Sequence, residues 1–321
     1  MRNNILGIDV GKRNLFFSDV TGNLKGETAN DGRGFRKIKR IIHENNIELV
    51  VLEATGGYEQ SVLIALTKEH CPVAVVDPAR VRNHARAAGT LAKTDVIDAK
   101  IIAHFGLCHQ PRVFELGTEN QNTLRSLVKR RRQVLKNQIQ EKCRLDRCFD
   151  EIPKESIHRM IRILGEEIDR LDVLMEALIE QDVVLQQKCE ILESCPAVGK
   201  KSAMMILAEC PELGTLNRKE IASLAGLAPM NRDSGMYQGK RFIQKGRKHL
   251  RNVLYMVVLS GQRHNVYLRN LFERFKAKGK PGKLALVVCM RKILTHLNAM
   301  VRDGTYWDLD VAQGTCRIEH S

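Results

Sequence analysis

The 321-residue sequence contains no CxxC pair, although it has nine cysteines. Closely spaced cysteine pairs are typical of zinc fingers and ribbons, and an odd number of cysteines leaves at least one without a disulfide partner. The pattern therefore indicates neither a disulfide framework nor a zinc site. We predict reduced and mostly buried thiols, as in proteins of a reducing compartment.

Long apolar runs are also lacking. No stretch reaches the roughly 18 unbroken apolar residues that identify a membrane-spanning helix. Asp9 interrupts the first apolar segment before it has the length of a signal-peptide core. We therefore expect a cytoplasmic bacterial protein that acts at the nucleoid and has no membrane partner.

Acidic residues are scarce in the C-terminal third. Residues 195–321 carry 22 Lys and Arg against 9 Asp and Glu, whereas residues 1–110 carry 15 against 12. The net charge of +15 is thus concentrated in one region, which would repel itself without a polyanion. Nucleic acid is the partner that this pattern favours, because each neutralised phosphate releases counterions. A solvated basic surface is the alternative.

Strand and helix patterns alternate through residues 1–110. Three apolar stretches separated by turns predict an antiparallel meander, and two buried strands and four helices follow. This order predicts an α/β ribonuclease H-like (RuvC-like) N-terminal domain. The expected strands are Ile5–Val10, Leu15–Val20, Leu24–Thr28, Leu49–Leu52 and Val73–Val76, and the expected helices are Phe35–Asn45, Tyr58–Glu69, 79–87 and 95–107.

Glycine and proline are almost absent from residues 118–190, where only Gly165 and Pro153 occur. Apolar residues recur at helical spacing on both sides of Pro153. This predicts a middle segment, residues 111–190, in which two long helices joined near Pro153 form a hairpin or coiled coil.

The remaining sequence predicts a mainly α C-terminal domain over residues 191–308, followed by a tail over 309–321. Residues 192–203 have the Pro/Gly turn of a helix-hairpin-helix-like element, which would present backbone N–H groups to a DNA phosphate. Similar turns also join ordinary helices.

Four acidic residues have the positions that a metal site needs. Asp9 and Glu53 end two predicted strands, and Asp95 and Asp98 are three residues apart, on one face of a predicted helix. A carboxylate at the end of a buried strand is unfavourable unless it is solvated, paired or metal-bound. Carboxylate oxygens suit Mg²⁺ or Mn²⁺. Each acid by itself is more typical of a cap or a turn.

The phrases GIDVGK, LEATGGYE and KTDVIDAK contain these four acids. With them, the chain resembles the Piv-type DNA invertase and insertion-sequence transposase family, whose members include bridge-RNA-guided recombinases. The resemblance covers about residues 5–305. It implies a RuvC-like domain with an Asp-Glu-Asp-Asp tetrad, a coiled coil and a transposase domain with a catalytic serine. The implied tetrad is Asp9, Glu53, Asp95 and Asp98, which would bind Mg²⁺ or Mn²⁺.

The loop GLAPMNRDSGMYQGKR matches the family's serine loop at Ser234. The resemblance implies that Ser234 attacks the scissile phosphate, in a composite site with the metal-binding acids. Without the resemblance, Ser234 reads as a turn residue, and Tyr58 and Tyr237 are rival nucleophiles. The basic residues expected to contact nucleic acid are Lys129, Arg130, Arg131, Arg132, Lys200, Lys201, Arg241, Lys245, Arg247 and Lys248.

The resemblance further implies DNA partners at the element ends and the target site, a guide RNA, and a homodimer or homotetramer. The alternatives are a DNA invertase without guide RNA, a RuvC-like junction nuclease and a non-catalytic nucleic-acid-binding protein. An actin-like kinase or ATPase is disfavoured because its second phosphate loop, DxGG, does not occur. The histidines show no metal-ligand spacing. We expect them to be surface, core or phosphate-contacting residues: His84, His104, His109, His249 and His264.

Overall fold

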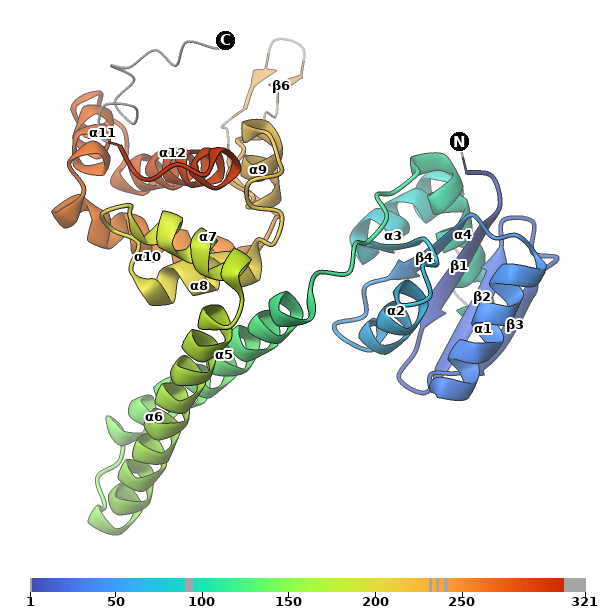
Figure 1. Ribbon diagram of the computed structural model, residues 1–321, viewed down its shortest axis with the longest axis horizontal. Helices are drawn as coiled ribbons and strands as arrows, with labels where there is room; N and C mark the ends of the chain where they lie inside the picture. The colour runs from blue at the N-terminus through green and yellow to red at the C-terminus, as the bar shows by residue number, and fades with distance from the viewer. Residues whose placement is uncertain (1, 90–94, 231–232, 235–236, 240–241, 309–321) are drawn as a thin grey trace. The chain divides into compact units, whose positions relative to one another are not determined.

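The computed structural model describes residues 2–89, 95–230, 233–234, 237–239 and 242–308. The chain divides into two compact units, unit 1 (Met1–Leu116) and unit 2 (Gly117–Ser321). Figure 1 shows unit 1 in blue to teal and unit 2 in green to red.

Unit 1 is built on a five-stranded mixed sheet with the order β3-β2-β1-β4-β5. The first three strands form an antiparallel meander, whereas β4 and β5 run parallel to β1. The predicted meander is confirmed, and the mixed sheet has the strand order of the predicted ribonuclease H-like class. The strands are β1 (Ile5–Val10), β2 (Asn14–Asp19), β3 (Lys25–Ala29), β4 (Leu49–Glu53) and β5 (Val73–Val76).

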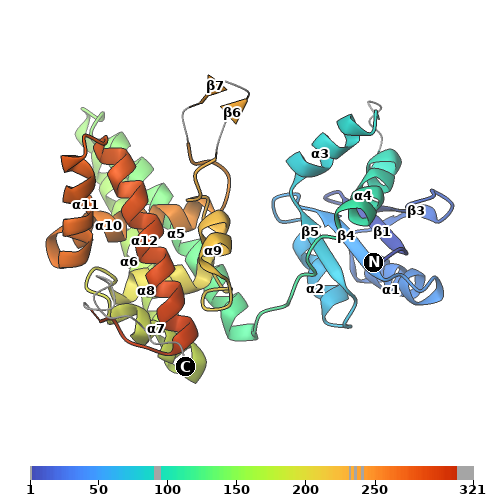
Figure 2. The ribbon, with the colours of Figure 1, turned by 90° about the horizontal axis from the view of Figure 1, so that it is seen from above.

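Helices cover both faces of this sheet (Figure 2). Because side chains alternate along a strand, Ile8 packs on one face with α1 and α2, and Ile5 packs on the other face with α3 and α4. The predicted helices are present with shifted ends; α1 begins before Phe35 because the Asp31 side chain caps it. The helices are α1 (Gly32–Glu44), α2 (Glu59–Thr67), α3 (Pro78–Ala87) and α4 (Asp95–His109).

Helix α4 lies unusually close to β1 and β4. A Cβ atom on Gly7 of β1 would stand 2.2 Å from the carbonyl oxygen of Ala99 and 2.4 Å from the nitrogen of Ala103. A Cβ atom on Gly106 of α4 would stand 2.6 Å from Val51 Cγ2. Glycines are therefore required on both elements for this approach. The contacts also show that the first turns of α4 lie toward the C-terminal end of β1.

Unit 2 begins with two long helices, α5 (Glu119–Leu145) and α6 (Glu151–Glu180), which pack against each other as an antiparallel pair (Figure 1). The predicted hairpin is present, and its supercoiling remains a prediction. Pro153 lies in the first turn of α6, where a missing N–H leaves no helix hydrogen bond unmade. The connection between the two long helices, residues 146–150, therefore lies just before Pro153.

The rest of unit 2 is a helical bundle, as the sequence predicts. Asp182 accepts hydrogen bonds from the N–H groups of Val184 and Leu185, so a new helix starts there and the second long helix ends earlier than expected. One apolar core joins these helices to Leu124 of α5 and Met175 of α6. The helices are α7 (Val183–Glu193), α8 (Lys200–Glu209), α9 (Arg218–Leu224), α10 (Lys248–His264), α11 (Val266–Ala277) and α12 (Gly282–Asp303).

Helix α12 is, within the described part of the chain, the one helix long and apolar enough to cross a membrane. Its inner face is buried through Cys289, Ile293 and Leu297, and it packs against α7, α9, α10 and α11. Asn298 on this face accepts a hydrogen bond from Gly214 N–H and donates one to Leu216 C=O. Its apolar composition is thus explained by its place in the core of unit 2.

We predict that Gly7→Ala destabilises unit 1, because the new methyl group would overlap the α4 backbone. Overpacking of this kind costs about 1–3 kcal/mol, measurable as a lower free energy of unfolding in urea. Gly32→Ala is the matched control, since the nearest atom to its added Cβ is 3.9 Å away. Equal stability of Gly7→Ala and Gly32→Ala would show that α4 does not need the close approach.

Candidate functional site

Asp9 and Glu53 lie side by side at the C-terminal ends of two parallel strands. The register pairs Ile8 of β1 with Leu52 of β4, so the next residues, Asp9 and Glu53, stand at the same level and on the same face. Both side chains are half-buried. The face that they share is the one with Gly7, which α4 covers.

Helix α4 brings the other two predicted acids to this edge of the sheet. Asp98 precedes Ala99, the residue whose carbonyl lies against Gly7, and its side chain is half-buried. Asp95 is the first residue of α4, and its side chain lies outside the described residues. The start of a helix stabilises negative charge through its backbone N–H groups and dipole. The ends of β1 and β4 and the start of α4 thus meet at one edge of the sheet. We call Asp9, Glu53 and Asp98, together with Asp95 as its predicted fourth member, the acidic edge.

The donors of the acidic edge are carboxylate oxygens, which suit Mg²⁺ or Mn²⁺ better than softer metals. These residue types could hold a hard divalent cation at this edge of the sheet.

A buried glutamate that the sequence analysis did not single out orders the segment after Glu53. Glu59 accepts hydrogen bonds from the N–H and hydroxyl of Thr55, at 3.1 and 2.8 Å, and from the N–H of Gly57 at 2.8 Å. Burial raises the pKa of Glu59, but these hydrogen bonds outweigh it and lower the pKa. Glu59 is therefore an ionised side chain that holds the loop beside Glu53.

Ser234 lies on a small β-hairpin of unit 2. It pairs with Tyr237 across two short strands, β6 (Asp233–Ser234) and β7 (Tyr237–Gln238), and a bridge between Met230 and Phe242 continues the pairing. The hairpin projects beyond α9, away from the helical core of its unit (Figure 2). Ser234 thus lies on a strand of a hairpin. The sequence did not predict this strand pairing.

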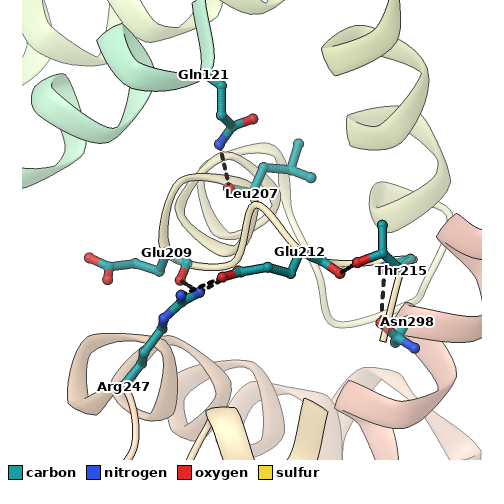
Figure 3. Close-up of polar contacts among 8 residues, drawn as sticks. Gln121, Leu207, Glu209, Glu212, Thr215, Arg247 and Asn298 are labelled. Carbon is teal, nitrogen blue, oxygen red and sulfur yellow. Dashed lines mark hydrogen bonds and ion pairs between the residues drawn. The ribbon is translucent and has the colours of Figure 1, made fainter. Parts of the chain in front are cut away.

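The base of this hairpin is closed by backbone contact. Gly226 and Gly246 have φ values of +68° and +64°, and a Cβ atom on Gly246 would stand 2.2 Å from Gly226 N. Just beyond, Arg247 donates two hydrogen bonds of 2.6 Å to Glu212 and one of 2.9 Å to Glu209 C=O (Figure 3). The return of the chain to the core is therefore fixed at Arg247.

Several of the predicted phosphate-binding residues form ion pairs within unit 2. Arg131 and Lys201 both pair with the buried Asp172, and burial, which raises the pKa of Asp172, is outweighed by these two cations. Arg132 pairs with Glu209, and Lys200 pairs with Glu176 and Glu180. These contacts hold α5, α6 and α8 together. Arg241 lies outside the described residues. The other predicted residues are exposed: Lys129, Arg130, Lys245 and Lys248.

Three residues without metal-ligand spacing in the sequence come together in unit 1. The donor atoms of His84, His104 and Cys108 lie within 4.8 Å of one another. The residues come from two helices, so no short motif marks them. The sequence held one signal of this cluster: His104 and Cys108 are four residues apart and so lie on the same face of a helix.

Two family models match parts of the chain. Residues 6–153 match the family model of DEDD transposases of the IS110 type, described as "Transposase", and residues 189–273 match "Transposase IS116/IS110/IS902 family". The pilin gene-inverting protein of Moraxella lacunata is 28% identical over 319 residues, covering 96% of this chain and 98% of its own. The counterpart from Moraxella bovis is 27% identical with the same coverage.

Two further similarities are partial. An uncharacterized 43.6 kDa protein of insertion element IS110 from Streptomyces coelicolor is 26% identical over 162 residues, covering 50% of this chain and 39% of its own. The solved structure of T. thermophilus RuvC in complex with a Holliday junction substrate covers 34% of this chain and 99% of its own, with 13% identity and a TM-score of 0.27.

We predict that Arg247→Ala lowers the free energy of unfolding by about 2–4 kcal/mol, because a half-buried carboxylate loses its charged partner. Arg302→Ala, which breaks an exposed pair with Asp303, is the control and should change stability by less than about 1 kcal/mol. Thermal and urea unfolding measure both variants.

The effect of Arg247→Ala should depend on pH. Burial raises the pKa of Glu212, but the Arg247 guanidinium outweighs it and lowers the pKa below its ordinary value. The stabilisation is therefore present above that ordinary value and is lost as pH falls through the lowered pKa. A stability difference that persists unchanged into strong acid would contradict the role of this pair.

Proposed function

Because the chain belongs to the IS116/IS110/IS902 family of transposases, we propose that it cuts and rejoins DNA at the ends of a mobile element and at a target site, with the acidic edge and Ser234 as its catalytic groups. The observation that carries the proposal is the convergence of the β1 and β4 ends with the start of α4. The four acids supply carboxylate oxygens, the donors that divalent cations in a phosphodiester exchange would need.

The acidic edge would hold Mg²⁺ or Mn²⁺ through Asp9, Glu53, Asp95 and Asp98. Its donors are all carboxylate oxygens, so the residues fit a hard divalent cation. When bound, such ions supply charge compensation for the attacking and leaving oxygens of a phosphodiester exchange. In this proposal β1 and β4 would position Asp9 and Glu53, and the close approach of α4 to β1 supports a place for Asp98 beside them.

Ser234 would act as the nucleophile of strand cleavage. Its Oγ would form a bond to phosphorus, the bond from phosphorus to one DNA oxygen would break, and the hydroxyl proton would pass to a general base. The released DNA oxygen would take up a proton. Rejoining would reverse these steps with the hydroxyl of a new strand.

The product is an inserted, excised or inverted segment. Relatives named pilin gene-inverting proteins match over nearly the whole chain, which favours inversion as a second candidate outcome. The excess of 22 basic over 9 acidic residues in 195–321 supports binding of DNA and of a guide RNA, through exposed residues such as Lys245 and Lys248. We further propose a cytoplasmic site of action and a homodimer or homotetramer as the working assembly.

We predict that Asp9→Asn reduces strand cleavage by more than about 100-fold while DNA binding is retained, because one metal ligand loses its charge. Cleavage of a labelled element-end substrate and gel-shift affinity measure the two properties. Asp31→Asn is the control, since Asn caps the start of α1 as well as Asp does. Normal cleavage by Asp9→Asn would remove the metal-site proposal.

We predict that Ser234→Ala abolishes the covalent protein–DNA adduct, because no hydroxyl remains at that position to form the phosphoester. The adduct is detected as labelled DNA that migrates with the denatured protein. Tyr237→Phe, at the paired position of the hairpin, should keep the adduct. An adduct that survives Ser234→Ala and is lost in Tyr237→Phe would assign the nucleophile to the tyrosine.

A further inference from the structure

A cluster of soft metal donors lies on the outer side of α3 and α4. His84 Nε2 is 2.8 Å from His104 Nδ1, and Cys108 Sγ is 3.8 Å from the same His104 nitrogen. All three donor atoms lie within 4.8 Å of one another. His84 is half-buried, whereas His104 and Cys108 are exposed. The donors therefore face one point that a small ion can reach from solvent.

The fold, rather than the side chains alone, holds this arrangement. His104 and Cys108 are one helical turn apart on α4, so they project from the same face. Phe105 beside them is fully buried, and its ring packs edge-on against His84 at 5.6 Å. Val81 of α3 is buried in the same core. The spacing between the two helices is thus set by apolar packing.

A second contact orients His84. Its Nε2 faces His104, and its Nδ1 lies 3.3 Å from His109 Nε2. Histidine ligands commonly donate their other ring N–H to an acceptor, which fixes the tautomer and the ring plane. The contact with His109 therefore restrains the ring of His84 with its Nε2 turned toward His104.

We infer that His84, His104 and Cys108 form a zinc site that ties α3 to α4, with His109 as the residue that orients His84. Two imidazole nitrogens and a thiolate suit Zn²⁺ and other soft or borderline cations, and they do not suit Mg²⁺. Three protein ligands leave a fourth position for water. Binding joins a thiolate sulfur to the ion and releases the Cys108 proton to solvent.

This site is separate from the acidic edge although both use α4. Asp98 and His104 are six positions apart, which is roughly 9 Å along a helix. The donor classes differ as well, since one set is carboxylate oxygen and the other nitrogen and sulfur. The zinc site would cross-link α3 to the helix that carries Asp98, and so stabilise unit 1 rather than take part in strand cleavage.

The test is titration of the full-length chain with Co²⁺, after metal removal by a chelator under reducing conditions. Co²⁺ bound to a thiolate gives a near-ultraviolet charge-transfer absorption, which carboxylate ligation does not give. We expect one equivalent of this signal, its displacement by Zn²⁺, and a rise in the melting temperature with Zn²⁺. Absence of the signal from the unmodified chain would overturn the inference.

Matched variants locate the site. Cys108→Ser and His104→Gln should remove the signal, and both positions are exposed, so folding should be retained. His109→Gln should weaken binding by about 10- to 100-fold. Cys143→Ser, another exposed cysteine, and Asp9→Asn should leave the signal unchanged. A signal that survives Cys108→Ser, or that Cys143→Ser removes equally, would overturn the assignment. Strand cleavage is measured separately in Mg²⁺, so failure here leaves the proposed function intact.

Discussion

The contact of α4 with β1 is the constraint on which the acidic edge depends. At Gly7 the helix backbone lies where a side chain would otherwise be, with Ala99 and Ala103 as the facing residues. A larger residue at any of these positions would lift α4 from the sheet. Because Asp98 is next to Ala99 in the chain, the same contact decides how near its carboxylate comes to the strand ends. Packing and ligand placement are therefore one problem in this unit.

Charge has two different roles in this protein. The excess of basic residues is a property of composition, and it favours a polyanionic partner. The Arg131–Asp172 pair joins α5 to α6, and the Arg247–Glu212 pair joins the start of α10 to the segment after α8; both are half-buried or buried, so these cations stabilise the fold. Breaking such a pair leaves a carboxylate without compensation in a poorly solvated site. Phosphate contacts are better sought among exposed residues such as Lys245 and Lys248.

The sequence predicted what depends on local pattern and missed what depends on distant partners. Alternating apolar residues predicted the strands of unit 1, and helical spacing predicted α5 and α6, because these periods are set by neighbouring residues. The two long-range pairs join residues 41 and 35 positions apart, which no periodicity records. His84 and His104 likewise come from different helices. For the four acids, motif resemblance supplied the long-range information that pattern alone lacked, and the structure brings the elements that carry Asp9, Glu53 and Asp98 to one edge of the sheet.

The two ends of α4 carry different kinds of donor. Its start stabilises carboxylates through free N–H groups and the positive end of the dipole. Its last turns carry His104, Cys108 and His109, whose nitrogen and sulfur donors suit softer cations. The proposed hard-cation ligands thus lie toward the first turn and the proposed zinc ligands toward the last. Both proposed sites use residues of α4. A zinc ion that joined α4 to α3 would therefore also restrain Asp98 at the acidic edge.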